Sequence, residues 1–432
     1  MTTAYWLCTT SFLAATSLQA PIGPGQRPSP FMLPPPTGRH AVGTTAWRVT
    51  DKSRSETLAD AGLPREVEVL AWYPATRGSG LRAPYLRWGL FELRPFAPRG
   101  ATATPFDSLA DVRTHAVIDA TPIASTSKFP TVVFSHGYGG MPSAHTALFE
   151  DLASHGYAIL SIVHPYESAA ARLADGRLVS FLNEAGAPRE SFRNVLDEWS
   201  REDETMAAVT RAVGDDEQRR LLGEYLSGLR ATGETLRRWV DDTKLVLDRL
   251  AELPAGTAPA RLASRLDTAR VGVAGHSMGG VTAGQFCLED SRCAAGLNLD
   301  GIPQYGSMIS QAISRPFLMV YSARAGRLGA SDAIYRRSAF PYFRVDIRET
   351  LHLDFTDMIF WNGPLRARGA LGTLAPLRVT EITRAIVREY FGQELVKTRS
   401  ALLAGKAVFP EVTVHLPTQT GPAGQPSVKP RP

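Results

Sequence analysis

One short segment joins a serine to the glycines that an exposed nucleophile needs. An apolar run, Val271 to Ala274, leads directly into the letters GHSMGG at residues 275–280. This is the G-x-S-x-G pattern, which between a strand and a helix holds the serine on a strained turn with its hydroxyl exposed. Glycine at 275 and 279 removes Cβ atoms that would clash in so tight a turn. Ser277 is therefore the predicted catalytic nucleophile.

A histidine must lie close to this serine, because a serine hydroxyl attacks only when a base takes its proton. His352 fits best among nine histidines, since it follows the predicted strand Phe343 to Ile347 and comes after the serine in chain order. His136 and His164 also follow predicted strands, and each could line a pocket. We expect His352 to be the base.

The third group must be a buried carboxylate that fixes the histidine tautomer and stabilises the imidazolium. Asp300 ends the apolar run Ala294 to Leu299, one strand after the nucleophile. Asp332 lies in the loop after the following strand, the commoner position for the acid, and Asp354 lies two residues from His352. The spacing favours Asp300 and leaves Asp332 as its rival.

Acyl transfer also needs two N–H donors aimed at the oxyanion. The backbone amide of Met278, directly after the serine, is the expected first donor. A glycine-rich stretch, HGYGG at residues 136–140, follows the predicted strand Thr131 to Ser135. Because glycines let a backbone turn its amides inward, we expect the second donor to be the amide of Tyr138.

These residues need a scaffold that brings strand ends together. Short apolar runs alternate with segments of helical periodicity, an order typical of an α/β fold with a mainly parallel central sheet and helices on both faces. The segment Glu234 to Leu253 has apolar residues at helical spacing and ends before a proline, so it should be a covering helix. The predicted strands are Val67 to Tyr73, Thr131 to Ser135, Ala158 to Val163, Val271 to Ala274, Ala294 to Leu299, Phe317 to Tyr321 and Phe343 to Ile347.

A long charged segment interrupts this alternation. Residues 165–232 are rich in charged and helix-forming side chains. We expect a helical insertion there, either a cap over the pocket or a surface helical pair.

The composition limits the class of protein. With 432 residues, 44% hydrophobic and 21% charged, the chain suits one large globular domain or two smaller ones, and not a disordered or collagen-like protein. A net charge of +5, without long Lys or Arg runs, does not form the basic surface that nucleic-acid binding requires. No nucleic-acid partner is expected.

The two ends of the chain differ from its body. Residues 1–20 are apolar like the end of an export signal, although the first basic residue is Arg27. We predict a signal peptide and a secreted or periplasmic protein, with a cytoplasmic protein as the alternative. Residues 21–38 are rich in Pro and Gly and predict a linker, residues 39–415 the folded catalytic domain, and residues 416–432 a disordered tail.

Three cysteines, at positions 8, 287 and 293, are too few for a disulfide scaffold and are not spaced as a zinc site. We therefore expect no metal site. Cys287 and Cys293 are six residues apart, and two independent thiols are favoured over a disulfide, because spacing alone does not bring two Cβ atoms together.

Several segments of residues 39–415 are shared with one known family. They are VGTTAWRVTD, VLAWYPA, FSHGYGG, VDDTKLVLDRL, VGVAGHSMGG, LNLDG and HLDFTD. On these the chain resembles the plasma-type, isoform II platelet-activating factor acetylhydrolase family of α/β-hydrolases. The resemblance implies the α/β-hydrolase fold, Asp300 as the acid, His352 in an H-x-x-F-x-D loop as the base, and Tyr138 as the second oxyanion amide.

The resemblance also implies a reaction. Members of that family hydrolyse short or oxidised sn-2 acyl groups of phospholipids without calcium. Related bacterial sequences instead resemble general carboxylesterases or polyester hydrolases. The membrane-docking helices of the mammalian form have no identified counterpart here, which leaves membrane contact unsupported. We predict a serine carboxylic-ester hydrolase that acts on small-molecule or lipid esters through an acyl-enzyme, with no cofactor. The alternative is a general carboxylesterase, a lipase or a polyester hydrolase. Amidase and acyltransferase activity would use the same residues, and a noncatalytic binding protein of this fold is a remote alternative.

Overall fold

The computed structural model describes residues 32–59, 62–97, 104–361, 364–406 and 408–416. The predicted signal peptide lies outside these residues, as do most of the predicted linker and all but the first residue of the predicted tail. The described end of the linker packs on the domain, because Leu33 is buried and the Thr37 amide donates to Asp151 Oδ1 at 2.9 Å.

A single large sheet organises the described part of the chain. It has eleven strands in the order β13-β12-β11-β10-β9-β5-β6-β2-β1-β4-β3. The six strands from β12 to β6 pair in parallel, whereas β2 is antiparallel to both of its neighbours and β13 is antiparallel to β12. The bounds are β1 Ala41–Ser55, β2 Pro64–Ala75, β3 Arg82–Pro84, β4 Arg113–Ile118, β5 Phe129–Ser135, β6 Ala158–Val163, β9 Leu266–His276, β10 Cys293–Leu299, β11 Phe317–Tyr321, β12 Tyr342–Ile347 and β13 Val412–His415.

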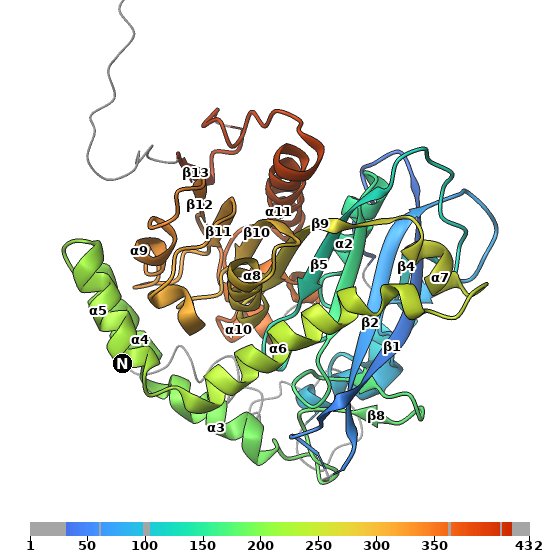
Figure 1. Cartoon of the computed structure of the whole chain (residues 1–432), viewed down its shortest axis with the longest axis horizontal. Coiled ribbons are helices and arrows are strands. Elements are labelled where there is room, and N and C mark those ends of the chain that lie inside the picture. The colour runs from blue at the N-terminus through green and yellow to red at the C-terminus, as the bar shows by residue number, and fades with distance from the viewer. Residues whose placement is uncertain (1–31, 60–61, 98–103, 362–363, 407, 417–432) are drawn as a thin grey trace, which may run out of the picture.

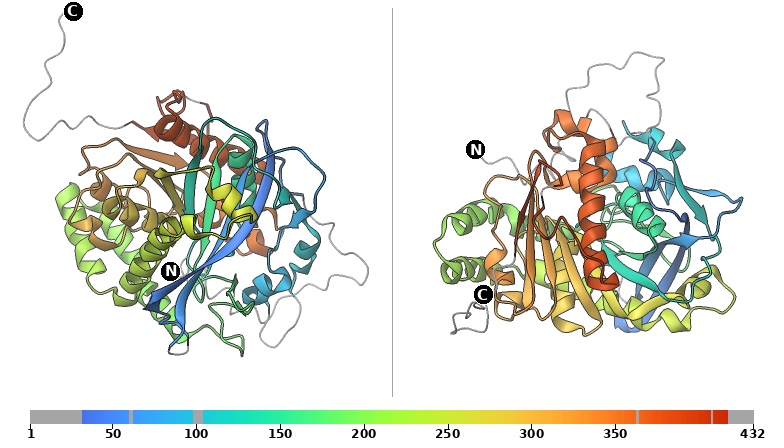
Figure 2. Two further views of the ribbon diagram at one scale, coloured as in Figure 1. Left: turned by 45° about the vertical axis from the view of Figure 1, so that its right-hand side comes forward. Right: turned by 90° about the horizontal axis from the view of Figure 1, so that it is seen from above.

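Helices cover both faces of this sheet (Figures 1 and 2). The helices α6 and α8 pack with one set of sheet side chains, which includes Val133, and α2 and α11 pack with the opposite set, which includes Val132. Neighbouring residues of β5 thus point into different cores, so the whole strand is apolar. The helices are α2 Thr146–Ser154, α3 Glu190–Glu198, α4 Glu202–Arg211, α5 Asp215–Leu226, α6 Arg230–Asp248, α7 Ala258–Ala263, α8 Met278–Glu289, α9 Asp332–Tyr335, α10 Pro364–Ala367 and α11 Pro376–Phe391.

The α/β fold predicted from the sequence is confirmed. Every predicted strand is present, and the predicted covering helix is α6, which begins four residues earlier than expected and is followed by a short 3-10 turn, Leu250–Glu252. The mainly parallel order explains why the predicted site residues all follow strands, since the carboxyl ends of parallel strands lie at one edge of the sheet.

The insertion at residues 165–232 contains α3, α4, α5 and a small two-stranded sheet, β7 Ala171–Arg172 with β8 Leu178–Val179. In Figure 1 these helices form an arc that reaches α9. Buried Glu202 on α4 accepts a hydrogen bond from Tyr305 Oη at 2.8 Å and pairs with buried Arg327. The insertion is therefore fixed to the loops that follow β10 and β11.

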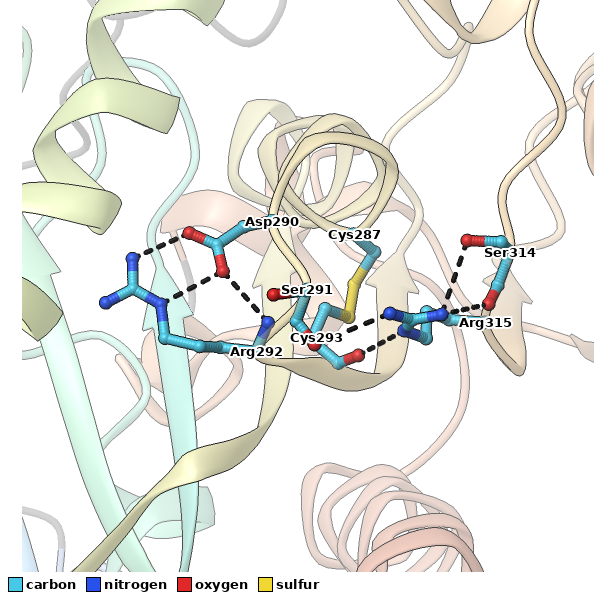
Figure 3. The surroundings of a disulfide bond; sticks show 7 residues. All are labelled: Cys287, Asp290, Ser291, Arg292, Cys293, Ser314 and Arg315. Atoms are coloured by element: carbon cyan, nitrogen blue, oxygen red, sulfur yellow. Dashed lines mark hydrogen bonds and ion pairs between the residues drawn. A yellow bond between two sulfur atoms is a disulfide. The ribbon is translucent and has the colours of Figure 1, made fainter.

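Cys287 and Cys293 form a disulfide, so the expectation of two independent thiols is wrong (Figure 3). Helix α8 ends just before β10 begins, and this reversal brings the two Cα atoms to 5.0 Å, within disulfide range. Two arginine contacts hold the turn, because Arg292 Nε donates to Asp290 Oδ1 at 2.9 Å and Arg315 Nε donates to the carbonyl of Cys293 at 2.6 Å.

Of the helices in the described ranges, none is both long enough and apolar enough to cross a bilayer.

Candidate active site

Ser277 lies at the turn between β9 and the first residue of α8. Its backbone has φ 55° and ψ −123°, a region that a residue with a Cβ adopts only under strain. The turn is held because the Ser277 amide donates to the carbonyl of Leu299 at 2.9 Å. Ser277 is half-buried, whereas His276 and Met278 on either side are buried. The strain thus presents this one side chain at the sheet edge.

The glycines around the serine are required by close backbone contacts. A Cβ at position 279 would lie 1.9 Å from the carbonyl oxygen of Ser135, and a Cβ at position 275 would lie 2.1 Å from the carbonyl carbon of Gly279. Both distances are far below a van der Waals contact. The prediction that glycine at 275 and 279 removes Cβ atoms that would clash is confirmed, and the structure adds that one of the clashes would be with the end of β5.

His352 and Asp300 meet directly. His352 begins a 3-10 turn, His352–Phe355, shortly after β12, and Asp300 follows β10. His352 Nδ1 lies 2.7 Å from Asp300 Oδ2. An ionised carboxylate only accepts, so Nδ1 donates the proton and Nε2 is left as the basic nitrogen. This is the tautomer that a general base needs.

Asp300 is fully buried and is held by four groups. The amide and the hydroxyl of Ser322 donate to its two carboxylate oxygens at 2.8 and 2.9 Å, and Arg324 Nη2 lies 2.9 Å from Oδ2, the oxygen that His352 also contacts. Burial alone would raise the pKa of Asp300, but Arg324 and His352 outweigh it and hold that pKa well below its ordinary value. Asp300 is therefore a carboxylate at neutral pH.

Burial and the charge of Arg324 lower the pKa of His352, and the hydrogen bond and charge of Asp300 only partly oppose them. The neutral form of His352 therefore predominates at neutral pH, and a neutral imidazole can accept a proton from a serine.

The segments that carry Ser277 and His352 lie side by side. Next to the serine, His276 Nε2 is 2.9 Å from the backbone carbonyl of His352, and the two imidazole rings are 4.5 Å apart between centroids. A Cβ on Gly301, which follows Asp300, would lie 2.2 Å from the carbonyl oxygen of Ser277. Among the described residues the Ser277 hydroxyl makes no side-chain hydrogen bond, and such contacts often tighten only around substrate.

The glycine-rich loop after β5 lies against the serine. A Cβ on Gly137 would lie 3.2 Å from Ser277 Cβ. Within the described ranges, neither the Tyr138 amide nor the Met278 amide donates to a backbone or side-chain acceptor, and the amide of Met278 belongs to the first turn of α8, where helical partners are absent. Both amides are thus available for an oxyanion.

The other histidines considered from the sequence are engaged elsewhere. His136 and His164 are buried, and His164 Nδ1 lies 2.9 Å from Asp242 Oδ2.

The rival carboxylates are also occupied. Asp332 begins α9 instead of lying in a loop, and it accepts hydrogen bonds from Tyr321, Tyr342 and Arg344. Asp354 accepts from the backbone amides of Leu351, in its own loop, and of Gly372, which follows α10. Of the three candidate acids, only Asp300 forms a hydrogen bond with the His352 ring in the described part of the chain.

The sequence reasoning missed Arg324 and Ser322. Both follow β11, and their signal was available, because polar residues directly after a central parallel strand lie at the same sheet edge as Asp300. No cluster of three or more metal-ligating side chains occurs among the described residues.

Comparisons with known proteins show which proteins this chain resembles. The model of the family "Platelet-activating factor acetylhydrolase, isoform II" matches residues 90–209, which include the Tyr138 loop but not Ser277. The platelet-activating factor acetylhydrolase of Cavia porcellus is 26% identical over 250 residues, 56% of this chain and 52% of that protein. A probable 1-alkyl-2-acetylglycerophosphocholine esterase of Arthroderma benhamiae is 22% identical over 294 residues, 63% of this chain and 60% of that protein. The chain spans about half the length of the first of these relatives.

A solved structure matches over a greater length. The ferulic acid esterase of Streptomyces cinnamoneus superposes with a TM-score of 0.67 at 27% identity, covering 89% of this chain and 98% of that one. Together with the parallel sheet and the strained serine turn, these likenesses confirm the predicted fold. The chain has the α/β-hydrolase fold and resembles the isoform II platelet-activating factor acetylhydrolase family, as its motifs predict.

Proposed function

We propose that the protein is a serine carboxylic-ester hydrolase. The observation that supports this most is the 2.7 Å contact between His352 and Asp300, at the sheet edge where the strained turn presents Ser277. The names of the relatives and of the structural neighbour point to the same reaction class.

The reaction proceeds in two halves. Ser277 Oγ attacks the ester carbonyl carbon as its proton passes to His352 Nε2, and the amides of Tyr138 and Met278 stabilise the oxyanion. His352 then gives the proton to the leaving alcohol, which leaves an acyl group on Ser277. Water, deprotonated by His352, hydrolyses this ester and restores the serine. Asp300 stabilises the imidazolium in both halves.

The proposed substrates are short or oxidised acyl esters, including sn-2 acetyl phospholipids. This specificity is supported by the relatives, whose names specify platelet-activating factor or 1-alkyl-2-acetylglycerophosphocholine. The test is a panel that contains p-nitrophenyl acetate, p-nitrophenyl palmitate and an sn-2 acetyl phospholipid. We expect faster turnover of the acetyl esters, and a higher kcat/KM on palmitate would contradict the proposal.

A second candidate is a carboxylesterase for esters with an aromatic acyl group. It is favoured by the ferulic acid esterase, which matches nearly its whole length, whereas the acetylhydrolases match about half of theirs. Aromatic rings also gather beside the oxyanion loop, where Tyr138 stacks on Phe192 at 4.6 Å and meets Trp199 edge to face at 5.5 Å. Adding methyl ferulate to the panel separates the candidates, because this ester would have the highest kcat/KM only for the second.

We also propose that the protein is exported to an oxidising compartment, either secreted or periplasmic. The disulfide between Cys287 and Cys293 supports this, since such bonds are rare where thiols are kept reduced. Cell fractionation with mass spectrometry of the N-terminus tests it. A protein recovered only from the cytoplasm, with both thiols reduced, would contradict export.

A further inference from the structure

One buried histidine lies directly under the oxyanion loop and takes no part in the proposed proton transfers. His136 follows β5 and is 1% exposed. Its ring packs edge to face against the rings of His164 and Trp239, at centroid distances of 5.4 and 5.1 Å. His136 therefore faces the protein interior, whereas the next residue, Gly137, lies against Ser277.

The contacts of His136 determine which of its nitrogens carries the proton. The backbone amide of His164 donates to His136 Nε2 at 3.3 Å. A backbone N–H can only donate, so Nε2 is an acceptor and the neutral ring carries its proton on Nδ1. Nδ1 lies 2.7 Å from the carbonyl oxygen of Gly137 and donates to it. Burial lowers the pKa of His136 to about 3, which keeps the ring neutral.

The carbonyl of Gly137 is thus held by two donors, His136 Nδ1 and the amide of Gly140 at 2.8 Å. That carbonyl belongs to the same planar peptide unit as the N–H of Tyr138, and in a trans peptide the two bonds point in opposite directions. A carbonyl fixed toward the buried histidine therefore fixes the Tyr138 N–H toward the opposite side of the loop. The glycines at 137, 139 and 140 would otherwise let this peptide rotate easily.

We propose that His136 is a positioning residue, which aims the Tyr138 amide at the oxyanion by holding the carbonyl of Gly137. The inference rests on the proposed function, because it assigns a second residue to the stabilisation of the same reaction intermediate. A preorganised donor stabilises the transition state without having to rotate at the moment of reaction.

The residue beneath His136 is itself rigidly held. His164 stacks on Trp239 with ring centroids 4.0 Å apart and planes 8° apart, and its Nδ1 contacts Asp242 at 2.9 Å. His164 Nε2 lies 3.3 Å from Ser135 Oγ. The support for the oxyanion loop thus extends from α6 through His164 to the end of β5.

Two substitutions separate this role from simple filling of space. His136→Asn keeps an N–H donor near the place of Nδ1, and His136→Leu has a similar size but no donor. We expect His136→Leu to lower kcat about 100- to 1,000-fold with KM little changed, the usual cost of one lost oxyanion donor, and His136→Asn to stay within about tenfold of wild type. Equal losses in the two folded variants would overturn the proposal.

A second readout follows the oxyanion itself. A trifluoromethyl ketone that adds to Ser277 forms a tetrahedral oxyanion, so its Ki should weaken in His136→Leu by the same factor as kcat/KM. Binding of the ester, measured in a Ser277→Ala background, should not change. A Ki that stays at the wild-type value would contradict the proposal.

Separate control experiments distinguish a loss of folding from a loss of function. Circular dichroism and thermal unfolding establish that each variant is folded. If His136→Leu does not fold, the folded His136→Asn variant still decides, because a loss of 100-fold or more there would overturn the proposal and near wild-type turnover would support it. A wild-type protein that hydrolyses no ester would refute the proposed function, whereas an active wild type and an equally active His136→Leu would refute only the role of His136.

Discussion

Arg324 and His352 share one oxygen of Asp300. The guanidinium nitrogen Nη2 lies 2.9 Å from Oδ2, and His352 Nδ1 lies 2.7 Å from the same atom. A cation beside the acid weakens the stabilisation that Asp300 can give to an imidazolium, and it lowers the pKa of His352 together with burial. The basicity of the proposed general base is therefore set by an arginine as well as by the carboxylate.

The first prediction concerns the pH dependence of activity. The base must be neutral, so kcat/KM falls as the pH drops through the pKa of His352. Replacing Arg324 by Gln removes a positive charge that lowers this pKa, so the pKa rises and activity is lost at a higher pH than in wild type. Arg324→Lys keeps the charge and is the control. Superimposable acid limbs for Arg324→Gln and wild type would show that the arginine does not tune the base.

The second prediction separates the acid from its rival. Asp300→Asn removes the acceptor that fixes the His352 tautomer, and kcat should fall about ten-thousand-fold, as for the equivalent change in serine proteases. Asp332→Asn is the matched control, since Asp332 bonds Tyr321 and Tyr342 and not His352. We expect it to lower the midpoint of thermal unfolding while folded protein keeps its kcat. A large loss of kcat in Asp332→Asn with little loss in Asp300→Asn would identify Asp332 as the catalytic acid.

The third prediction concerns a buried ion pair under the oxyanion loop. Asp242 Oδ2 lies 2.6 Å from Arg65 Nη2, both side chains are buried, and His164 contacts the same carboxylate. Asp242→Asn removes one of the buried carboxylates that neutralise Arg65, which keeps Glu56 at 2.8 Å, so the change should cost about 3 kcal/mol of unfolding free energy, the low end of the range for a broken buried ion pair. Urea denaturation measures this, with Asp241→Asn, at the half-buried neighbouring position, as the control. Equal denaturation midpoints for the two variants would show that the ion pair between Asp242 and Arg65 does not stabilise the fold.

The fourth prediction concerns the disulfide between α8 and β10. The double variant Cys287→Ser/Cys293→Ser loses a crosslink that closes a short loop, worth about 2 kcal/mol on the chain-entropy estimate. The crosslink lies at the end of α8 remote from Ser277, so the kcat of folded protein should not change. Thermal unfolding with and without dithiothreitol checks it, and a wild-type midpoint that dithiothreitol does not move would argue against a stabilising bond.

The centre of the sheet could be predicted because its strands are buried on both faces and are apolar throughout. The outer strands β1, β3, β4 and β13 were not predicted. Strand β1, Ala41–Ser55, is long, but its buried residues include Gly43, Thr44 and Thr45 beside apolar ones, so its sequence shows no clear apolar period. Its position depends on pairing with β2, which no local signal specifies.

The active site, like the sheet, has some features that the sequence predicts and others that it does not. The nucleophile could be predicted because the strained turn at Ser277 requires glycines at fixed positions in the sequence. His352 and Asp300 could be predicted because each follows a predicted strand. That Arg324 lies at this sheet edge could have been predicted from its place after β11, but its ion pair with Asp300 could not, since that contact depends on how the loop after β11 folds back. The disulfide was missed for a related reason, because the reversal between α8 and β10 decides the distance between the two cysteines.

The nucleophilic role of Ser277 is tested most directly by a fluorophosphonate probe followed by peptide mass spectrometry, beside turnover of p-nitrophenyl acetate. We predict a stoichiometric adduct on Ser277, with loss of nearly all turnover both after labelling and in Ser277→Ala. A folded wild-type protein that forms no adduct, or a Ser277→Ala variant that hydrolyses the ester at the wild-type rate, would contradict a serine hydrolase at this site.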